Sequence, residues 1–316
     1  MKILEYTTIN RQILRDFEKN FYSLFSHDAI KKSNRNIGKN FSFAVIEKEN
    51  KRIIVLFDVD DGTGITPCKN GKLDGDCKLS HDKFDELKKD YNTQNFIIFK
   101  AQLDLSRNKY YPFKKNVYPL GYFCNNYEFI NKLKFNSSIE KDIDVAWVGT
   151  VNLNASPWNW PKDQDIKMWP TGWRINGYKR LINIKERRSD LKIVVSNQKL
   201  PVEKYLNLIA RSKICLELPG CGWLTRRFVE NICLGKCILS MKQSQILPFD
   251  IKENYHYHTL GHDLDSLESE LDVLRNNTSL INYYENNTKD LKDMYDPKNI
   301  AKYVYNKILK EFHGKN

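Results

Sequence analysis

The stretch Lys213–Met241, KICLELPGCGWLTRRFVENICLGKCILSM, decides the fold expected for this chain. The apolar run at 213–218 predicts a buried strand, and a proline- and glycine-rich turn follows at 219–222. A second apolar run at 236–241 predicts another buried strand, and the segment between the two predicts a helix. Strands joined by a helix in this way are typical of parallel α/β sheets.

The glycine turn and the start of the helix predict a binding site for an anion. The first N–H groups of a helix have no partner inside it and point outward at the positive end of the helix dipole. Arg226 and Arg227 lie in the first turn, where that dipole disfavours positive charge. A phosphate would offset the mismatch, because a guanidinium binds it through paired hydrogen bonds. We therefore expect Gly222, Thr225, Arg226 and Arg227 to contact phosphate groups.

Glu230 shares a helical face with both arginines, which leaves two interpretations. It could pair with an arginine, although such a pair with arginine first contributes only about 0.2–0.5 kcal/mol. It could instead accept hydrogen bonds from the two hydroxyls of a ribose. With the arginines on a diphosphate, the second interpretation predicts a site for a nucleoside diphosphate.

Two common nucleotide motifs do not fit this stretch. The pattern GxGxxG requires a third glycine where Thr225 stands, and the second strand ends at Lys242-Gln243 without an acidic residue for an adenosine ribose. The sequence therefore disfavours NAD. A GxxxxGK[ST] motif is not present either, which excludes a P-loop.

Composition describes an ordinary globular protein with an excess of positive charge. The 316 residues include 28% charged side chains, and the formal net charge is +12. The basic residues are dispersed and contain no block of five like charges, so we expect no specific nucleic-acid surface. The charge favours a phosphorylated substrate and allows peripheral contact with an anionic membrane.

The cysteines and the N-terminus predict the compartment. Seven cysteines, an odd number without a CxxC pair, indicate free thiols rather than a zinc site. No apolar run approaches the roughly 20 residues of a membrane span, and the N-terminus lacks the features of a signal peptide. We expect a cytoplasmic protein, membrane-peripheral or in the host cytoplasm if it is viral.

Predicted strands alternate with helices in both halves of the chain, which favours two α/β domains with largely parallel sheets. The polar segment 126–142 suggests a boundary near residue 140. We therefore expect an N-terminal α/β domain at 1–140 and a C-terminal α/β domain at 141–316 that ends in helices. Ligands of such sheets bind beyond the carboxyl ends of the strands.

The block formed by Arg227, Glu230, Gly235 and Cys237 with the strand after it resembles the nucleotide-sugar site of GT-B glycosyltransferases. The nearest likeness is to the exostosin-like and family 1-like group. DVAWVGT at 144–150 resembles the opening of the second domain of these enzymes. The segment YPFKKNVYPLGYF at 111–123 resembles the end of their first domain. The resemblance covers about residues 142–242, and the first domain matches in outline.

This resemblance implies two Rossmann-like domains facing a cleft, in which a UDP- or GDP-linked sugar passes its glycosyl group to a glycan or another hydroxyl acceptor. It implies no further cofactor and no essential metal. Arg226, Arg227 and the helix start would hold the leaving diphosphate, and Glu230 would hold the ribose. The other expected contacts are Gly149 and Thr150 near the phosphates, Lys199, and Arg174.

The base that takes the acceptor proton would come from the first domain, where Asp58, Asp60 and Asp61 follow an apolar strand. Mutual repulsion of close carboxylates raises the pKa of at least one of them, which suits a base. Alternatively, these residues cap a turn, or Asp58 and Asp60 form the Asp-x-Asp metal site of a GT-A-like glycosyltransferase or a phosphatase. A basic nucleic-acid-binding protein is a further alternative. His256 and His258, predicted to share a strand face, are weaker candidates for metal ligands.

Overall fold

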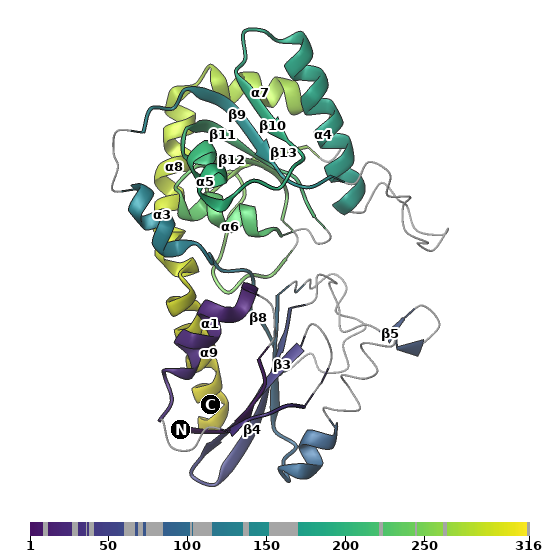
Figure 1. Cartoon of the computed structure of the whole chain (residues 1–316), viewed down its shortest axis with the longest axis vertical. Helices are drawn as coiled ribbons and strands as arrows, with labels where there is room; N and C mark the ends of the chain where they lie inside the picture. Colours follow the sequence, from purple (N-terminus) through teal and green to yellow (C-terminus); the bar gives the residue numbers. More distant parts are fainter. Residues whose placement is uncertain are drawn as a thin grey trace. The chain divides into compact units, whose positions relative to one another are not determined.

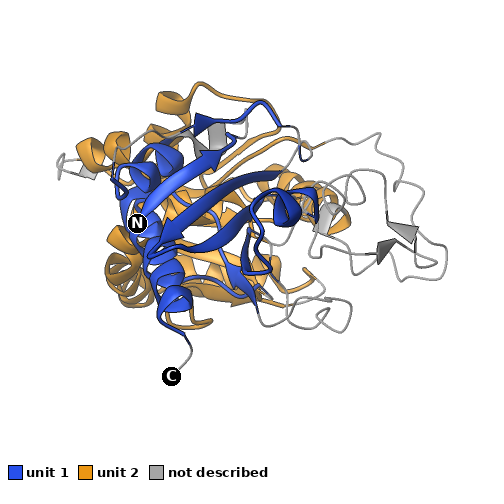
Figure 2. Ribbon diagram, turned by 90° about the horizontal axis from the view of Figure 1, so that it is seen from below, with its two compact units in different colours: residues 1–125, 245–250, 296–316 blue, residues 126–244, 251–295 orange. Residues whose placement is uncertain are grey.

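The computed structural model describes residues 1–8, 12–26, 31–35, 37, 41–59, 67–68, 72–73, 85–101, 103, 116–134, 139–151, 170–220, 224–243, 245–261 and 264–314. The chain forms two compact units, coloured separately in Figure 2. Unit 1 comprises residues 1–125, 245–250 and 296–316, and unit 2 comprises residues 126–244 and 251–295. The first passage between units thus falls at 125/126, before the position near 140 that the polar segment suggested.

Unit 1 is built on a mixed sheet with the strand order β2-β1-β3-β4-β7-β8 (Figure 1). Its elements are β1 (Lys2–Tyr6), α1 (Gln12–Tyr22), β2 (Lys31–Lys32), β3 (Phe41–Lys48), β4 (Lys51–Asp58), β7 (Phe96–Lys100), β8 (Val117–Pro119) and α9 (Pro297–His313), with a separate pair β5 (Pro67–Cys68) and β6 (Lys72–Leu73). β4 runs parallel to β7 but antiparallel to β3. β3 and β4 are antiparallel because a tight turn at Glu49 and Asn50, both with positive φ, joins them as a hairpin.

Helices cover both faces of the unit 1 sheet. Phe17 of α1 packs edge-on against Phe57 of β4, with 5.4 Å between ring centroids. On the opposite face, Leu87 from the helical segment 85–90 packs in a core with Leu56. The alternation of neighbouring residues between the two faces explains why β4 is a nearly continuous apolar run.

The C-terminal helix α9 belongs to unit 1, whereas the sequence placed the terminal helices in the second domain. Its buried face packs against α1, and Tyr303 meets Phe99 of β7 edge-on. Helical periodicity shows that a helix has an apolar face, but not which sheet covers it. That choice depends on the tertiary packing.

Unit 2 is Rossmann-like. Its elements are α3 (Tyr127–Lys134), β9 (Ile143–Val148), α4 (Pro170–Arg187), β10 (Ile193–Ser196), α5 (Val202–Ala210), β11 (Ser212–Glu217), α6 (Arg226–Cys233), β12 (Cys237–Met241), β13 (His258–Leu260), α7 (Leu267–Arg275), α8 (Thr278–Lys292) and the 3₁₀ turn η4 (Asp293–Tyr295). All neighbouring strands of its sheet are parallel, in the order β10-β9-β11-β12-β13. The predicted α/β class with parallel strands and C-terminal helices is confirmed.

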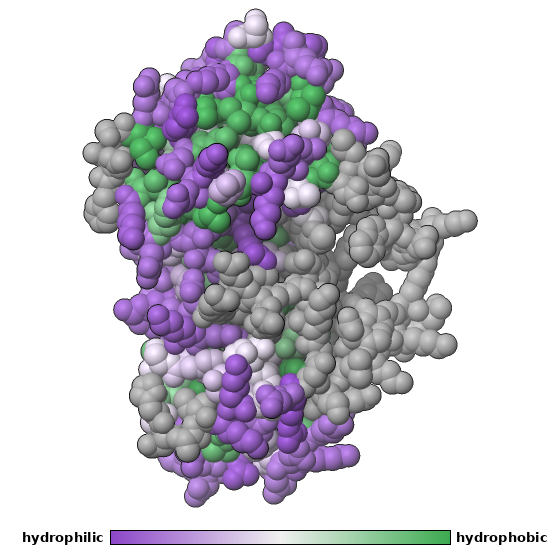
Figure 3. All heavy atoms as spheres, viewed as in Figure 1, coloured by the Kyte–Doolittle hydropathy of each residue, from purple (hydrophilic) through white to green (hydrophobic). Residues whose placement is uncertain are grey.

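Side-chain alternation along β11 explains the layers of unit 2. Leu216 points into a core that it shares with α4 and α7, while Glu217 points to the other face and meets Thr225 at the start of α6. α5 and α6 therefore lie on the face opposite α4 and α7 (Figure 1). In the view of Figure 3, hydrophobic side chains reach the outer surface of unit 2 between many hydrophilic ones.

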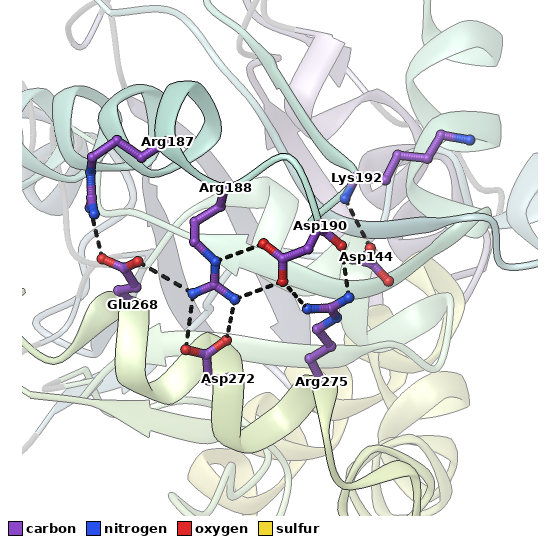
Figure 4. Close-up of polar contacts among 8 residues, drawn as sticks. All are labelled: Asp144, Arg187, Arg188, Asp190, Lys192, Glu268, Asp272 and Arg275. Carbon is purple, nitrogen blue, oxygen red and sulfur yellow. Dashed lines mark hydrogen bonds and ion pairs between the residues drawn. The ribbon is translucent and has the colours of Figure 1, made fainter.

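An ion network joins the end of α4 to α7, and we call it the α4–α7 ion network (Figure 4). Arg188 makes paired hydrogen bonds to Asp190 at 2.8 and 2.9 Å and to Asp272 at 2.9 and 3.1 Å. Hydrogen bonds from Arg188 hold the pKa values of Asp190 and Asp272 below their usual range. The other members are Arg187, Glu268 and Arg275.

None of the helices in the described part of the chain has the combination of length and hydrophobicity that a membrane crossing requires. Cys124, Cys215, Cys233 and Cys237 are buried free thiols, as the cysteine pattern indicated.

Candidate functional site

The strand order of unit 2 identifies where a ligand of this sheet would bind. Numbered along the chain, the five strands have the order 2-1-3-4-5, so the direction of winding reverses between β9 and β11. In open α/β sheets the crevice beyond the carboxyl ends of the strands at this switch point is the usual binding site. Here the carboxyl ends are Val148 and Glu217, followed by Gly149 and by the turn at 218–220.

Arg227 bridges the two strands at the switch point. Its Nη1 donates to the carbonyl of Val148 at 2.6 Å, and its Nη2 donates to the carbonyl of Leu218 at 3.2 Å and to Glu217 at 3.3 Å. The guanidinium also lies over the ring of Trp147, 5.3 Å from its centroid. Every one of these partners belongs to β9, to β11 or to the residue just after β11.

Glu217 is the counter-ion of Arg227, and it was not among the residues expected at the site. Its side chain is only 2% exposed, and the hydroxyl of Thr225 also donates to it. A signal was present in the sequence, because Glu217 is a charged residue inside an otherwise apolar strand, KICLEL. An acidic residue in such a position usually has a fixed partner.

The start of α6 carries the features expected of an anion site. Thr225 caps the helix by accepting a hydrogen bond from the N–H of Phe228 at 3.2 Å. Within the described residues, no acceptor meets the backbone N–H of Arg226 or Arg227. The side chain of Arg226 is exposed and forms no ion pair with the described part of the chain. Two open N–H groups and one exposed cation therefore lie in the same helical turn.

Gly235, part of the sequence block that resembles GT-B glycosyltransferases, ends the same helix. Its φ of 64° is in the left-handed region, and its N–H donates to the carbonyl of Ile232 at 2.8 Å. The chain then enters β12 directly.

Glu230 lies on α6 one turn beyond Arg226 and is buried, with 8% of its surface exposed. It forms no ion pair with Arg226 or Arg227 in the described part of the chain, so the simple i,i+4 pairing is excluded there. Instead, its Oε1 accepts a hydrogen bond from the side chain of Asn126 at 2.9 Å. Burial raises the pKa of Glu230, against the opposing effects of Asn126 and Tyr205.

The remaining candidates in unit 2 surround the same edge of the sheet. Gly149 follows β9, and its N–H donates to the carbonyl of Ser196 at 2.9 Å. Arg174 of α4 donates to the carbonyl of Pro219 at 2.6 Å and to the carbonyl of Thr150 at 3.3 Å. Lys199 is exposed in the segment after β10. These residues thus follow or contact the carboxyl ends of three parallel strands.

The predicted base segment lies in unit 1 and is only partly described. Asp58, the last residue of β4, forms a buried ion pair of 2.9 Å with Lys100 of β7, and both side chains are almost fully buried. Asp60, Asp61 and Gly222 lie outside the described residues. Lys100 thus gives Asp58 a partner that was not expected from the sequence.

His256 and His258 do not share a strand face, because β13 begins only at His258. His256 accepts a hydrogen bond from the backbone N–H of Lys252, whereas His258 lies between Tyr284 and Glu270 at 2.9 and 2.7 Å. In the part of the chain that the structure describes, no group of three or more His, Cys, Asp or Glu residues is placed to hold a metal.

The fold and the site define unit 2 as a Rossmann-like module with its polar residues gathered at the switch point. No protein-family model matches the chain, and no curated protein matches its sequence. Among solved structures it is similar to a Listeria monocytogenes protein assigned as a UDP-N-acetylglucosamine 2-epimerase, with 10% identity over 98% of this chain and 88% of that one and a TM-score of 0.41. A likeness of this size concerns the broad outline alone, so we take the chemistry from the residues of unit 2.

Proposed function

We propose that this protein is a glycosyltransferase that binds a nucleotide-activated sugar at the switch point of unit 2. One observation carries the proposal: the capped start of α6 lies at the carboxyl edge of an all-parallel sheet, with the exposed Arg226 and two N–H groups that no described residue accepts from. Helix N-termini at such edges bind phosphate groups. A nucleoside diphosphate would use both features of the site. Its phosphates would bind at the helix start, and its ribose hydroxyls would donate to a neighbouring carboxylate such as Glu230.

The same residues suit the chemistry of glycosyl transfer. When the sugar–phosphate bond breaks, the electron pair stays on the diphosphate oxygen, and negative charge grows there. Arg226 and the dipole of α6 would stabilise that charge without having to reorganise during the reaction. Glu230 already uses one carboxylate oxygen for Asn126, so ribose hydroxyls would bind its other oxygen.

The acceptor hydroxyl must lose a proton as it attacks the sugar. Of the three predicted bases, Asp58 is already paired with Lys100. We therefore assign this role to Asp60 or Asp61. We also propose, from the sequence, that the acceptor is a glycan or another compound with a free hydroxyl group.

Nucleotide binding tests the proposal directly. We expect UDP or GDP to raise the melting temperature of the protein in the presence of EDTA, and Arg226→Ala to remove most of that rise. Lys185→Ala is the matched control, because Lys185 is an exposed cation of α4 that forms no ion pair within the described residues. Donor hydrolysis with a panel of UDP- and GDP-sugars then identifies the sugar.

The alternatives give different results in the same experiments. Activity that EDTA abolishes and that Asp60→Asn impairs through the metal would favour the Asp-x-Asp enzyme. Binding of DNA or RNA that weakens steeply with salt would favour the nucleic-acid-binding protein. If no nucleoside diphosphate stabilises the protein, the glycosyltransferase proposal is wrong.

A further inference from the structure

We propose that the two adjacent arginines of α6 have separate roles: Arg226 contacts the diphosphate, and Arg227 with Glu217 forms a fixed pair that shapes the site. This inference rests on the proposed function of unit 2. It differs from the expectation that both guanidinium groups bind phosphate. Arg227 is then a positioning residue, since it acts through the two loops that it joins.

The contacts of Arg227 carry the first half of the inference. Both terminal nitrogens already donate to protein acceptors, namely the carbonyls of Val148 and Leu218 and the carboxylate of Glu217. The side chain of Arg227 is 16% exposed, and its guanidinium lies over the ring of Trp147. Glu217 neutralises the charge of Arg227, and the hydrogen bonds of the guanidinium link the ends of β9 and β11.

Moving Arg227 to a ligand would carry a large cost. Glu217, 2% exposed, would lose its cation and remain as a buried carboxylate whose donor, among the described residues, is the hydroxyl of Thr225. Removing one partner of a buried ion pair is strongly destabilising, because the other charge stays away from water. The carbonyls of Val148 and Leu218 would lose a donor at the same time.

Arg226 differs in each of these respects. Its side chain is exposed, and within the described residues it has no acidic partner that would have to be given up. It also belongs to the turn in which the two open N–H groups lie. A phosphate at this turn would receive backbone hydrogen bonds, the helix dipole and one guanidinium together.

Glu217→Gln distinguishes the two roles of Arg227. If Arg227 bound the phosphate, loss of its counter-ion would free its charge and tighten the binding of a nucleoside diphosphate. If Arg227 is a positioning residue, the variant loses stability without ligand and binds no more tightly than the wild type. We expect the second result. A tighter complex in Glu217→Gln would overturn the inference.

Substitutions of the arginines complete the test, with UDP, GDP and inorganic pyrophosphate as probes in titration calorimetry. Arg226→Ala should weaken binding about 10- to 100-fold, as expected for lost hydrogen bonds to a charged group, and leave the ligand-free melting temperature unchanged. It should also reduce the salt dependence of binding, which a purely structural residue would not affect. Arg227→Lys should lower the ligand-free melting temperature by about 6 °C or more, because a lysine cannot serve three acceptors.

The outcomes separate this inference from the proposed function. Full affinity in Arg226→Ala, with wild-type binding of UDP or GDP, would contradict the division of roles and leave the proposed function standing. If pyrophosphate alone binds and shows the expected pattern, the division of roles holds and the nucleotide-sugar proposal is wrong. If the wild type binds none of the three probes, both are wrong. Should Arg227→Lys fail to fold, Glu217→Gln and Arg226→Ala still decide between the roles.

Discussion

The replacement Gly149→Ala tests how firmly the switch point of unit 2 is built. A Cβ atom at this position would lie 1.7 Å from Nη1 of Arg227 and 2.9 Å from its Cζ. A methyl group and a nitrogen need about 3.5 Å, so the guanidinium would have to move on the order of 1.8 Å. A freely moving arginine would avoid the methyl group at little cost. Arg227 has three acceptors and the ring of Trp147 to lose.

The size of the effect follows from these contacts. A displacement of that size breaks the 2.6 Å hydrogen bond to Val148 and distorts the two bonds made by Nη2. Hydrogen bonds to charged groups contribute about 1.5–3 kcal/mol each, and breaking a buried ion pair costs about 3–5 kcal/mol. Because some bonds can partly re-form, we expect the free energy of unfolding of unit 2 to fall by about 3 kcal/mol.

Tryptophan fluorescence during urea unfolding measures this change in unit 2. All six tryptophans of the chain fall within unit 2, so the signal reports on that unit alone. With a denaturant slope of about 2 kcal/mol per M, the urea midpoint should fall by roughly 1.5 M. Thr150→Ala is the matched control: it alters an exposed side chain of the same loop and should shift the midpoint little.

A double-mutant cycle identifies the cause. If the new methyl group acts by displacing Arg227, then Gly149→Ala combined with Arg227→Ala should be scarcely less stable than Arg227→Ala alone. A loss below about 0.5 kcal/mol in Gly149→Ala, or full additivity in the cycle, would refute the reasoning. Either result would mean that the guanidinium moves freely.

Three further predictions concern other charged groups. Asp58→Asn should lower the melting temperature strongly, because the buried Lys100 would lose the carboxylate charge that it faces; Lys100→Met in the same chain should recover part of the loss. The pKa values of the acidic residues in the α4–α7 ion network are lowered, so its contribution to stability should be present above about pH 4 and lost as the pH falls through the lower pKa values. Between pH 2 and 6, the melting temperature should therefore fall less steeply with acid in Arg188→Ala than in the wild type. An unchanged slope would contradict this. The pKa of Glu230 is raised by burial, so stability is lost as the pH rises through that pKa; Glu230→Gln should flatten the pH dependence of the melting temperature above pH 4.5, and a wild-type slope in this variant would count against it.

Local patterns predicted the elements that build the candidate site. The helix expected between the two apolar runs is α6, and the apolar runs themselves are β11 and β12. Thr225 caps α6, and Gly235 ends it with a positive φ. The strands and the helix depend on neighbouring residues only, so spacing and residue type were enough to predict them, whereas the cap at Thr225 and the conformation of Gly235 come from the structure.

Long-range pairing was not visible in the same way. Arg227 and Glu230 share a helical face, yet Arg227 pairs with Glu217 and Glu230 binds Asn126. Likewise, three neighbouring aspartates suggested mutual repulsion, while Asp58 lies beside Lys100 from the adjacent strand. When a side chain could reach several partners, the tertiary packing decides which of them it contacts.

The sequence alone determined that this protein has α/β architecture with a parallel sheet around Lys213–Met241, and that a helix with two arginines in its first turn begins after a glycine turn. Only the tertiary structure decided which arginine keeps its charge exposed. The reason is the strand order: it brings the carboxyl ends of β9 and β11 together beside α6, where Arg227 finds Glu217 and two carbonyls and Arg226 finds no acidic partner among the described residues.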